Sequence, residues 1–338
     1  MVDTILEVDD LKTHFFLDEG VLKALDGVSF HIGKQETLGV IGESGCGKSV
    51  TARSILRIVP SPGQTVGGTA KLFSDGGASR DLLKLKPTGE EIRAIRGKEI
   101  SMIFQEPMTS LSPVHTVGDQ IEEAILIHKT QDKKEAHQFA LDMLDRVGIP
   151  NPKDLSKAYP FQLSGGMRQR VMIAIALSCN PKLLLADEPT TALDVTVQAQ
   201  ILELMKELQQ ELGMSIMFIT HDLGVIAEVA DRVAVMYLGR VVESAPVKEL
   251  FRNPLHPYTV NLLKSIPRVG RGRGKKLQTI QGTVPIPINL PQCCPFMARC
   301  EQAMPGVCDK AVPALEQVAE NHSVRCYLHH ENNEVAST

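Results

Sequence analysis

The sequence predicts an α/β fold in which helices cover a mostly parallel sheet. Short apolar runs recur along the chain, and the segments between them show the residue spacing of amphipathic helices. Strands and helices that alternate in this way are typical of βαβ units around a parallel sheet. The apolar runs are residues 37–41, 100–104, 183–186 and 216–219.

The composition indicates a soluble globular protein, with 43% hydrophobic and 22% charged residues. A net charge of −4 shows no bulk attraction to nucleic acid, so none is expected as a partner. No run approaches the roughly 18 apolar residues of a membrane span. The acidic N-terminus also lacks the pattern of a signal peptide. We therefore expect a cytosolic chain, which could still dock on a membrane partner.

Local patterns predict three further regions. The first 35 residues show the alternating pattern of strands and carry turn signals at Asp18-Glu19-Gly20 and Asp26-Gly27, which predicts antiparallel strands. Residues 115–180 are rich in helical periodicity and predict a helical insert. A hairpin is expected around Leu238-Gly239.

From about Asn253 the prolines accumulate, and the sequence predicts irregular structure and a linker. A cluster of glycines and basic residues follows. We favour a solvated loop over contact with lipid or nucleic acid, because no aromatic residues are interleaved with the charges. The basic residues are Arg268, Arg271, Arg273, Lys275 and Lys276.

A phosphate-binding loop is predicted after the first apolar run. Residues 42–49 read Gly-Glu-Ser-Gly-Cys-Gly-Lys-Ser and fit the pattern G-x-x-x-x-G-K-[ST] between a strand and a helix. Glycines let backbone N–H groups approach the phosphates, and the helix N-terminus supplies positive potential. Lys48 would reach the β- and γ-phosphates, and Ser49 would ligate magnesium. The residues expected to bind the nucleotide are Ser44, Gly45, Cys46, Gly47, Lys48, Ser49 and Val50, with Cys46 interpreted as a small residue and not a reactive thiol.

Two acidic residues follow the apolar run at 183–186. A carboxylate at a strand end can hold magnesium beside a phosphate loop, which suits Asp187. Glu188 could polarise the attacking water as a general base. Alone, this pattern would indicate a buried strand with charged residues at its exit. After a phosphate loop, the catalytic interpretation is favoured.

A second helix start suited to anions is predicted at Ser164-Gly165-Gly166, where a serine and two glycines open a periodic helix. It lies about 120 residues after the phosphate loop. Two such helix starts in one chain are natural for a site that two subunits share.

Together these motifs resemble the ATPase subunits of ABC transporters, whose signature motif is the serine–glycine–glycine segment. The resemblance implies a RecA-like P-loop ATPase core with an antiparallel β subdomain and an α-helical subdomain, followed here by an irregular Cys-rich C-terminal extension. Further positions match the family pattern. They are Gln105, which would touch magnesium and face the membrane subunits, Thr191-Ala192-Leu193-Asp194 at the dimer interface, His221 at the γ-phosphate, and Phe15, in preference to Phe16, stacked on adenine.

The resemblance also implies a mechanism. ATP would lie between this chain and the Ser164-Gly165-Gly166 segment of a second subunit, and Glu188 and His221 would orient the attacking water. The implied catalytic residues are Glu188, His221, Lys48 and Gln105, and the implied magnesium ligands are Ser49, Gln105 and Asp187.

The C-terminal part narrows the resemblance to dipeptide and oligopeptide importers. The segment that follows the ATPase core in these importers resembles residues 252–259, Arg-Asn-Pro-Leu-His-Pro-Tyr-Thr, and residues 294–300 of this chain. Met167, directly after the signature glycines, resembles the residue at this position in the importer's D-type ATPase. This implies peptide import at the cytoplasmic face of a prokaryotic cell membrane, as a peripheral subunit. The implied partners are a second, different ABC ATPase subunit, two transmembrane permease subunits and an extracytoplasmic substrate-binding protein.

The same resemblance sets the expected domains. Residues 1–252 would form the nucleotide-binding domain, with a helical subdomain at about 106–175, and residues 253–338 would form the extension. Relatives also import nickel or oligosaccharides, which is the alternative for the cargo. A soluble ABC ATPase of DNA repair or translation and a redox-gated ATPase are alternatives of another class, although no second ATPase core, coiled coil or zinc insert is visible.

Five of the seven cysteines crowd the last 46 residues. In a cytosolic chain such a cluster indicates a metal more than disulfides. The spacing C-x5-C-x7-C-x17-C matches neither the C-x2-C pairs of zinc sites nor ferredoxin patterns, so spacing alone leaves zinc and iron–sulfur equal. D-type relatives carry a [4Fe–4S] cluster in this tail, so the resemblance favours one, with zinc as the alternative. The implied ligands are Cys294, Cys300, Cys308 and Cys326, whereas Cys293 is left out. His322, His329 and His330 are possible substitute ligands, but we expect them to be solvated tail residues.

Overall fold

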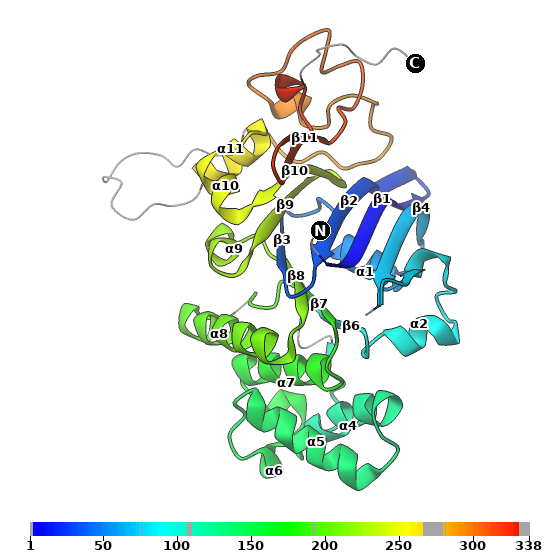
Figure 1. The fold of residues 1–338 in the computed structure, drawn as a ribbon, viewed down its shortest axis with the longest axis vertical. Helices are drawn as coiled ribbons and strands as arrows, with labels where there is room; N and C mark the ends of the chain where they lie inside the picture. Colours follow the sequence, from blue (N-terminus) through cyan, green and yellow to red (C-terminus); the bar gives the residue numbers. More distant parts are fainter. Residues whose placement is uncertain are drawn as a thin grey trace. The chain divides into compact units, whose positions relative to one another are not determined.

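The chain folds into two compact units, each assembled from separate stretches of sequence (Figure 1). The computed structural model describes residues 3–74, 76–106, 110–191, 193–265, 280 and 282–330, so the basic cluster at 268–276 lies outside the described residues. The first unit comprises Met1–Ile5, Ile32–Thr37 and Phe73–Ile219. The second comprises Leu6–His31, Leu38–Leu72 and Thr220–Thr338.

The first unit contains three parallel strands, β6 (Ile100–Ile103), β7 (Leu183–Asp187) and β8 (Ser215–Ile219). All three are buried along their whole length, as expected of parallel strands covered on both faces. The predicted α/β fold class is confirmed here, with strand ends that shift by about one residue. Because parallel strands end at the same edge of a sheet, the residues that follow β6 and β7 lie near one another.

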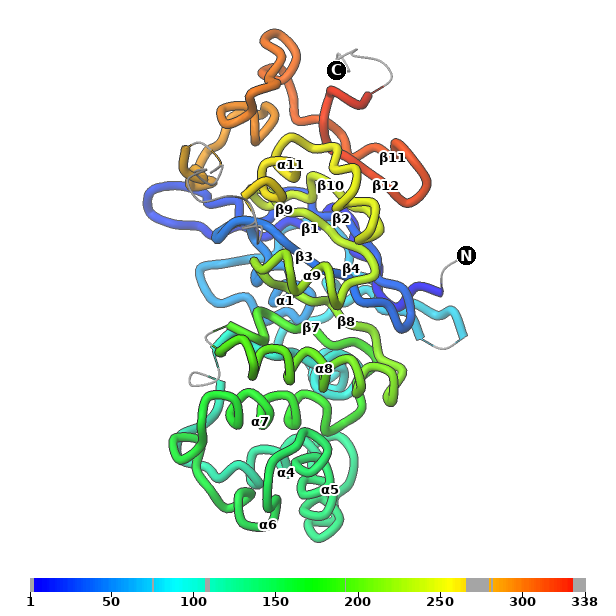
Figure 2. Tube along the Cα trace, turned by 90° about the vertical axis from the view of Figure 1, so that its left-hand side faces the viewer, coloured from blue at the N-terminus to red at the C-terminus, as the bar shows by residue number. Residues whose placement is uncertain are grey.

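Helices α4 (Val117–His128), α5 (Lys133–Arg146), α6 (Pro152–Leu155) and α7 (Gly165–Leu177) pack together in the first unit. Figure 2 shows α7 between α8 and the other three helices, and α7 also packs on β6. Thr116 forms a capping box at the start of α4, and Asp132 caps α5. The remaining elements of this unit are β5 (Ser79–Asp81), η1 (Leu82–Lys84), α2 (Glu90–Ile95), η2 (Pro160–Gln162) and α8 (Val195–Leu212).

An antiparallel sheet, β2-β1-β4, makes up much of the second unit. Strands β1 (Thr4–Leu17) and β2 (Gly20–Gly33) meet at the expected turn after Leu17, and β4 (Gly63–Phe73) pairs with β1. The second expected turn, Asp26-Gly27, is wrong. Both residues lie inside β2, where Gly27 adopts a positive φ of 98° without reversing the chain.

A second set of strands in this unit has the order β11-β12-β10-β9-β3. Strand β3 (Thr37–Ile41) runs parallel to β9 (Arg232–Tyr237), which forms the predicted hairpin with β10 (Arg240–Pro246). The C-terminal extension then adds β12 (His322–Val324) to β10 and β11 (Glu316–Ala319) to β12. The helices are α1 (Lys48–Ile55), α9 (Leu223–Val229), α10 (Val247–Arg252), α11 (Pro257–Lys264), η3 (Met297–Arg299) and η4 (Tyr327–His329).

The extension is therefore less irregular than its prolines predict. Pro257 occupies the first turn of α11, a position where a missing N–H costs nothing, so this proline starts the helix and does not break it. Within the described residues, no helix combines the length and the apolar character needed to cross a bilayer.

One buried carboxylate ties the extension to the rest of the second unit. Glu243 of β10 accepts hydrogen bonds from the backbone N–H groups of Leu255 (2.7 Å) and His256 (2.9 Å), and lies 2.8 Å from His322 Nε2. Burial raises the pKa of Glu243, but the hydrogen bonds from His322 and the two backbone N–H groups outweigh it and hold the pKa below its ordinary value. The expectation that His322 is solvated is wrong, because this ring is buried as the partner of Glu243.

Replacing this carboxylate should weaken the whole second unit. We expect Glu243→Ala to lower the free energy of unfolding by about 3 kcal/mol, because it leaves several buried donors without an acceptor. The loss should shrink below about pH 4, because a carboxylate with a lowered pKa stabilises the fold above its ordinary pKa and stops doing so as it protonates.

Urea unfolding at pH 7 and at low pH measures both effects. The control is Glu228→Ala on the exposed face of α9, which should change the stability by less than about 0.5 kcal/mol. Equal stabilities for the two variants would contradict the proposed anchoring.

Candidate functional site

The glycine-rich loop of the second unit begins directly after β3. Gly42 has a φ of 153°, and a Cβ atom there would lie 2.2 Å from the carbonyl oxygen of Met236, so only glycine fits. The N–H of Cys46 donates to the carbonyl of Glu43 (3.3 Å) and closes the turn. Helix α1 then starts at Lys48, and no side chain caps its N-terminus. The loop therefore ends in a helix start suited to an anion, as its sequence pattern predicts.

Lys48 is buried and folds back over this loop. Its Nζ donates to the carbonyl oxygens of Gly42 (2.8 Å) and Glu43 (3.3 Å), while Ser44 and Gly45 are exposed. The ammonium is therefore held at the mouth of the loop by two backbone carbonyls, and it also lies 3.9 Å from Cys46 Sγ. Cys46 is fully buried, and burial raises the pKa of its thiol, which argues against a reactive thiol at this position.

The loop is supported from behind by the β9–β10 hairpin. The N–H of Gly239 donates to the carbonyl of Cys46 (2.9 Å), and the carbonyl of Gly239 accepts from the N–H of Asp26 (2.9 Å). Gly239 has a φ of 71°, and a Cβ atom there would lie 2.6 Å from the carbonyl oxygen of Ala24. This glycine thus lets three backbone segments meet behind the phosphate loop.

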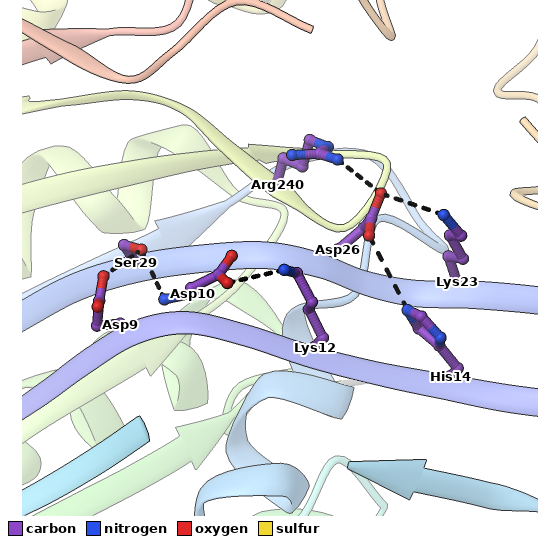
Figure 3. A network of polar contacts seen from close by, with 8 residues as sticks. All are labelled: Asp9, Asp10, Lys12, His14, Lys23, Asp26, Ser29 and Arg240. Atoms are coloured by element: carbon purple, nitrogen blue, oxygen red, sulfur yellow. Dashed lines mark hydrogen bonds and ion pairs between the residues drawn. The ribbon is translucent and has the colours of Figure 1, made fainter. Parts of the chain in front are cut away.

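A polar network fixes β2 to the same hairpin (Figure 3). The carboxylate of Asp26 pairs with Arg240 at 2.6 Å and lies 3.9 Å from both Lys23 and His14. Burial lowers the pKa of His14 despite the nearby Asp26 carboxylate. No sequence pattern predicts this network, since Asp26 and Arg240 are 214 residues apart and the local signal at Asp26-Gly27 resembles a turn.

The aromatic candidate Phe15 lies on β1 of this unit. It is half-buried and its ring lies beside Gly63, whereas the neighbouring Phe16 is 47% exposed. Nearby, Thr13 and Ser54 share a buried hydrogen bond of 2.8 Å that joins β1 to α1. Strand β1 is therefore fixed against the helix that starts at the phosphate loop.

His221 belongs to the same unit and is exposed. It follows Thr220, whose N–H donates to the carbonyl of Val40 in β3 at 3.3 Å. Asp222 caps α9 through the N–H groups of Gly224 and Val225. His221 is thus held near the end of the strand that leads into the phosphate loop.

The first unit brings two other predicted residues together. Glu188 follows the buried Asp187 at the end of β7, and its Oε2 accepts from Gln105 Nε2 (3.1 Å) and from Thr191 Oγ1 (2.8 Å). Glu188 has a left-handed φ of 49°, an uncommon conformation that is enriched at functional sites. Its N–H donates to the carbonyl of Ile219 (2.9 Å), which fixes this conformation. The carboxylate is therefore oriented by two donors, ready to accept a proton or polarise a water.

The serine–glycine–glycine segment starts α7 in the same unit. Ser164 is the N-cap, and its Oγ accepts from the N–H of Met167 at 3.3 Å. Ser164 and Gly165 are exposed, and no other atom would come within 4 Å of a Cβ at Gly165. This helix N-terminus is thus open to a ligand or partner. Of the neighbouring motif, Ala192 lies outside the described residues, and Asp194 caps α8.

The four cysteines singled out in the extension line one small cavity, together with His256 and Phe296. Burial, with a smaller contribution from the neighbouring thiols, raises the pKa of Cys294 to about 12 and that of Cys326 to about 11. All four are free thiols. Cys293 lines a neighbouring, largely apolar cavity of about 260 Å³, with Asp26 and Arg240.

The expectation that His330 is solvated is also wrong, because its side chain is only 7% exposed, and His329 is partly buried. His329 Nε2 lies 3.0 Å from the carbonyl of Leu255, and His330 lies 3.5 Å from Glu316. Across the described ranges, no three Cys, His, Asp or Glu side chains are arranged closely enough to hold a metal ion. The four thiols therefore converge on one cavity without forming a metal-binding geometry.

Comparisons with known families place the motifs in context. Residues 25–191 match the ABC transporter family, and residues 242–308 match the family described as the C-terminal region of oligopeptide/dipeptide transporters. The chain is 54% identical to the oligopeptide transport ATP-binding protein AppD of Bacillus subtilis, over 98% of each protein. It is 49% identical to the dipeptide transport ATP-binding protein DppD of the same organism, over 99% of this chain and 98% of DppD.

Solved structures of about 27% identity share the fold. A dimeric post-hydrolysis state of the ATP-binding cassette MJ0796, bound to ADP and Pi, gives a TM-score of 0.63 over 72% of this chain and 99% of that one. The cbiO1 protein from Clostridium perfringens, part of an ABC transporter complex, is 28% identical and gives 0.61 over 77% and 95%.

The support behind the phosphate loop can be tested at Gly239. We expect Gly239→Ala to weaken ATP binding at least tenfold and to destabilise the protein by at least about 2 kcal/mol, because the new methyl group would collide with the backbone at Ala24. Isothermal titration with ATP and thermal unfolding measure the two effects.

The matched control is Gly306→Ala. Gly306 has a similar φ of 80°, but nothing lies within 4 Å of its Cβ position. It should therefore show only the backbone cost of about 1 kcal/mol and normal ATP binding. Equal ATP affinities in the two variants would show that the hairpin does not support the loop.

Proposed function

Since the chain belongs to the ATP-binding proteins of ABC transporters, and within them to the oligopeptide and dipeptide type, we propose that it hydrolyses ATP to power peptide import. The observation that carries the proposal is the similarity along nearly the whole chain, which includes the extension as well as the ATPase motifs. The reported relatives carry peptide cargoes in their names, which favours peptides over nickel or oligosaccharides.

In the proposed mechanism, a water attacks the γ-phosphate in line with the leaving ADP. Glu188 accepts the proton of this water, and His221 helps to orient it. Lys48 neutralises charge on the transferred phosphoryl group. The orientation of the Glu188 carboxylate by Gln105 and Thr191 supports its role, because a general base must be held in one position.

Magnesium fits the residues present. A buried carboxylate at a strand end, Asp187, and the hydroxyl of Ser49 at the start of α1 are oxygen ligands of the type that magnesium prefers, and Gln105 adds an amide oxygen. When bound, the ion would neutralise negative charge on the phosphate groups. Phe15 is the proposed adenine contact, although its half-buried ring leaves the exposed Phe16 as the nearest alternative.

We propose that two ATPase subunits complete each other's sites. The exposed N-terminus of α7, at Ser164 and Gly165, is a ready anion site that would serve the nucleotide of the partner subunit. The dimeric cassette MJ0796 supports this arrangement by analogy. Met167 favours a different ATPase chain as the partner, as in the D-type subunit of a heterodimer.

The remaining partners follow from the transporter class. Two permease subunits and an extracytoplasmic substrate-binding protein would complete the importer, with this chain peripheral at the cytoplasmic face of the membrane. The packed helices α4 to α7, residues 117–177, are the proposed helical subdomain, close to the expected range of about 106–175. Together with Gln105, they would carry the nucleotide state to the permeases.

The assignment of the base predicts a specific variant. We expect Glu188→Gln to bind ATP normally but to lose at least about 100-fold in turnover, because the amide cannot accept the proton of the attacking water. Glu207→Gln, an exposed change on α8, is the control and should hydrolyse ATP like the wild type. Hydrolysis by Glu188→Gln at the wild-type rate would overturn the assignment.

We further propose that the four cysteines of the extension hold a [4Fe–4S] cluster, with zinc as the alternative. Their shared cavity supports this proposal. A cluster would supply crosslinks to a small, proline-rich tail, so we favour a structural role.

Two adjacent cysteines offer a sharp test. We expect Cys294→Ala to lose bound iron and the absorbance near 400 nm in anaerobically purified protein, because this thiol lines the shared cavity. Cys293→Ala should retain both, since Cys293 is not among the residues that line that cavity. Stoichiometric zinc without colour in the wild type would refute the cluster, and iron loss in both variants would refute the choice of ligands.

A further inference from the structure

The second residue of the phosphate loop, Glu43, is held by the C-terminal extension. Both of its carboxylate oxygens pair with the guanidinium of Arg299, at 2.7 Å (Nη1 to Oε2) and 3.0 Å (Nη2 to Oε1). The Arg299 side chain is only 6% exposed and that of Glu43 is 26% exposed. A bidentate pair of this kind fixes both the distance and the orientation of the carboxylate.

Arg299 is itself held in a defined position. Its Nη1 donates to Tyr237 Oη (3.3 Å) and its Nη2 donates to the carbonyl of Gly282 (3.3 Å). The guanidinium also lies near the rings of Tyr237 and Phe296, about 6 Å from each centroid. Tyr237 ends β9, the strand parallel to the one that leads into the phosphate loop. The position of the Arg299 guanidinium is therefore fixed by these hydrogen bonds and by the two aromatic rings.

The backbone of Glu43 is held by the extension as well. Its N–H donates to Tyr258 Oη at 2.8 Å, and Tyr258 is fully buried in α11. The rings of Tyr258, Tyr237 and Phe296 contact one another, with centroids 4.7 to 5.4 Å apart. One aromatic cluster thus supports both contacts to Glu43.

The backbone carbonyl of Glu43 contacts the phosphate loop and its lysine. Its carbonyl accepts from the N–H of Cys46 and from Nζ of Lys48, both at 3.3 Å. Glu43 is therefore the junction at which the extension meets the turn of the loop and the lysine that must reach the phosphates. A shift of this residue would move the acceptors of Lys48.

We propose that Arg299 and Tyr258 are positioning residues for ATP hydrolysis, which hold the phosphate loop through Glu43. The inference rests on the proposed ATPase function and makes the extension a working part of the nucleotide site. It does not depend on what the neighbouring cysteines hold. A buried ion pair is often no more stabilising than apolar residues of the same size, so its use here is to set a position.

The test combines nucleotide binding with steady-state hydrolysis on the full-length chain. We expect Arg299→Ala to raise the Kd and KM for ATP by about tenfold to a hundredfold, because the loop loses its fixed position. Arg299→Lys keeps the charge without the bidentate geometry and should lie between Arg299→Ala and the wild type. Tyr258→Phe keeps the ring and removes the acceptor for the Glu43 N–H, so it should also raise KM.

A merely structural role predicts a different result. In that case the variants would melt earlier, but their folded fraction would bind ATP with the wild-type Kd, and this would overturn the proposal. Lys310→Ala, an exposed charge deletion in the extension, is the control and should leave Kd and KM unchanged.

A double-mutant cycle identifies Glu43 as the route. In a Glu43→Ala background, Arg299→Ala should cause little further loss of ATP affinity. Equal losses in both backgrounds would show that Arg299 does not act through Glu43. Failure of the wild type itself to bind or hydrolyse ATP would instead refute the proposed function, so the two failures are distinguishable.

Discussion

A loop whose backbone N–H groups must face a phosphate can use few of those groups to hold its own shape, and its glycines add no side chains for the purpose. The neighbouring structure must therefore supply the support. Met236 crowds Gly42 from behind, Gly239 donates to Cys46, and Arg299 with Tyr258 holds Glu43. All of these supporting residues lie after position 235, although the loop itself lies near residue 45. The second unit is thus organised around the conformation of one short loop.

The contacts with the rest of the second unit also explain how a proline-rich extension can fold. The extension is short and rich in proline, and a chain of this size buries only a small core of its own. It packs on β9 and β10 instead. Phe296 contacts Tyr237 of β9, and Glu243 of β10 hydrogen-bonds to the backbone N–H of His256 before α11 and to the ring of His322. The cavity lined by the cysteines lies against Phe296, so the ligands proposed for a cluster and the contact to the phosphate loop share one support.

Much of the fold and half of the site were predictable, because their signals are local. Buried parallel strands read as short apolar runs, and residues after neighbouring strands meet at one edge, which brings Gln105 to Glu188. Local signals also misled. Asp26-Gly27 resembles a turn, but β2 continues through both residues, and Asp26 pairs with Arg240. Likewise, His322 reads as a solvated tail residue until Glu243, 79 positions earlier, is seen beside it.

By itself the sequence determined the chemistry of this protein: a loop with glycines at the required spacing, a lysine and a serine at its end, two acids after a strand, and a second helix start for an anion. Those features depend on residues that are close in the chain, so their order and spacing carry the information. Only the tertiary structure decided what holds the loop in place. The pair of Glu43 and Arg299 joins residues 256 positions apart, and no local pattern distinguishes that arginine from a solvated one. Arg299 can reach Glu43 because β3 and β9 run side by side, and Tyr237 at the end of β9 accepts a hydrogen bond from Arg299.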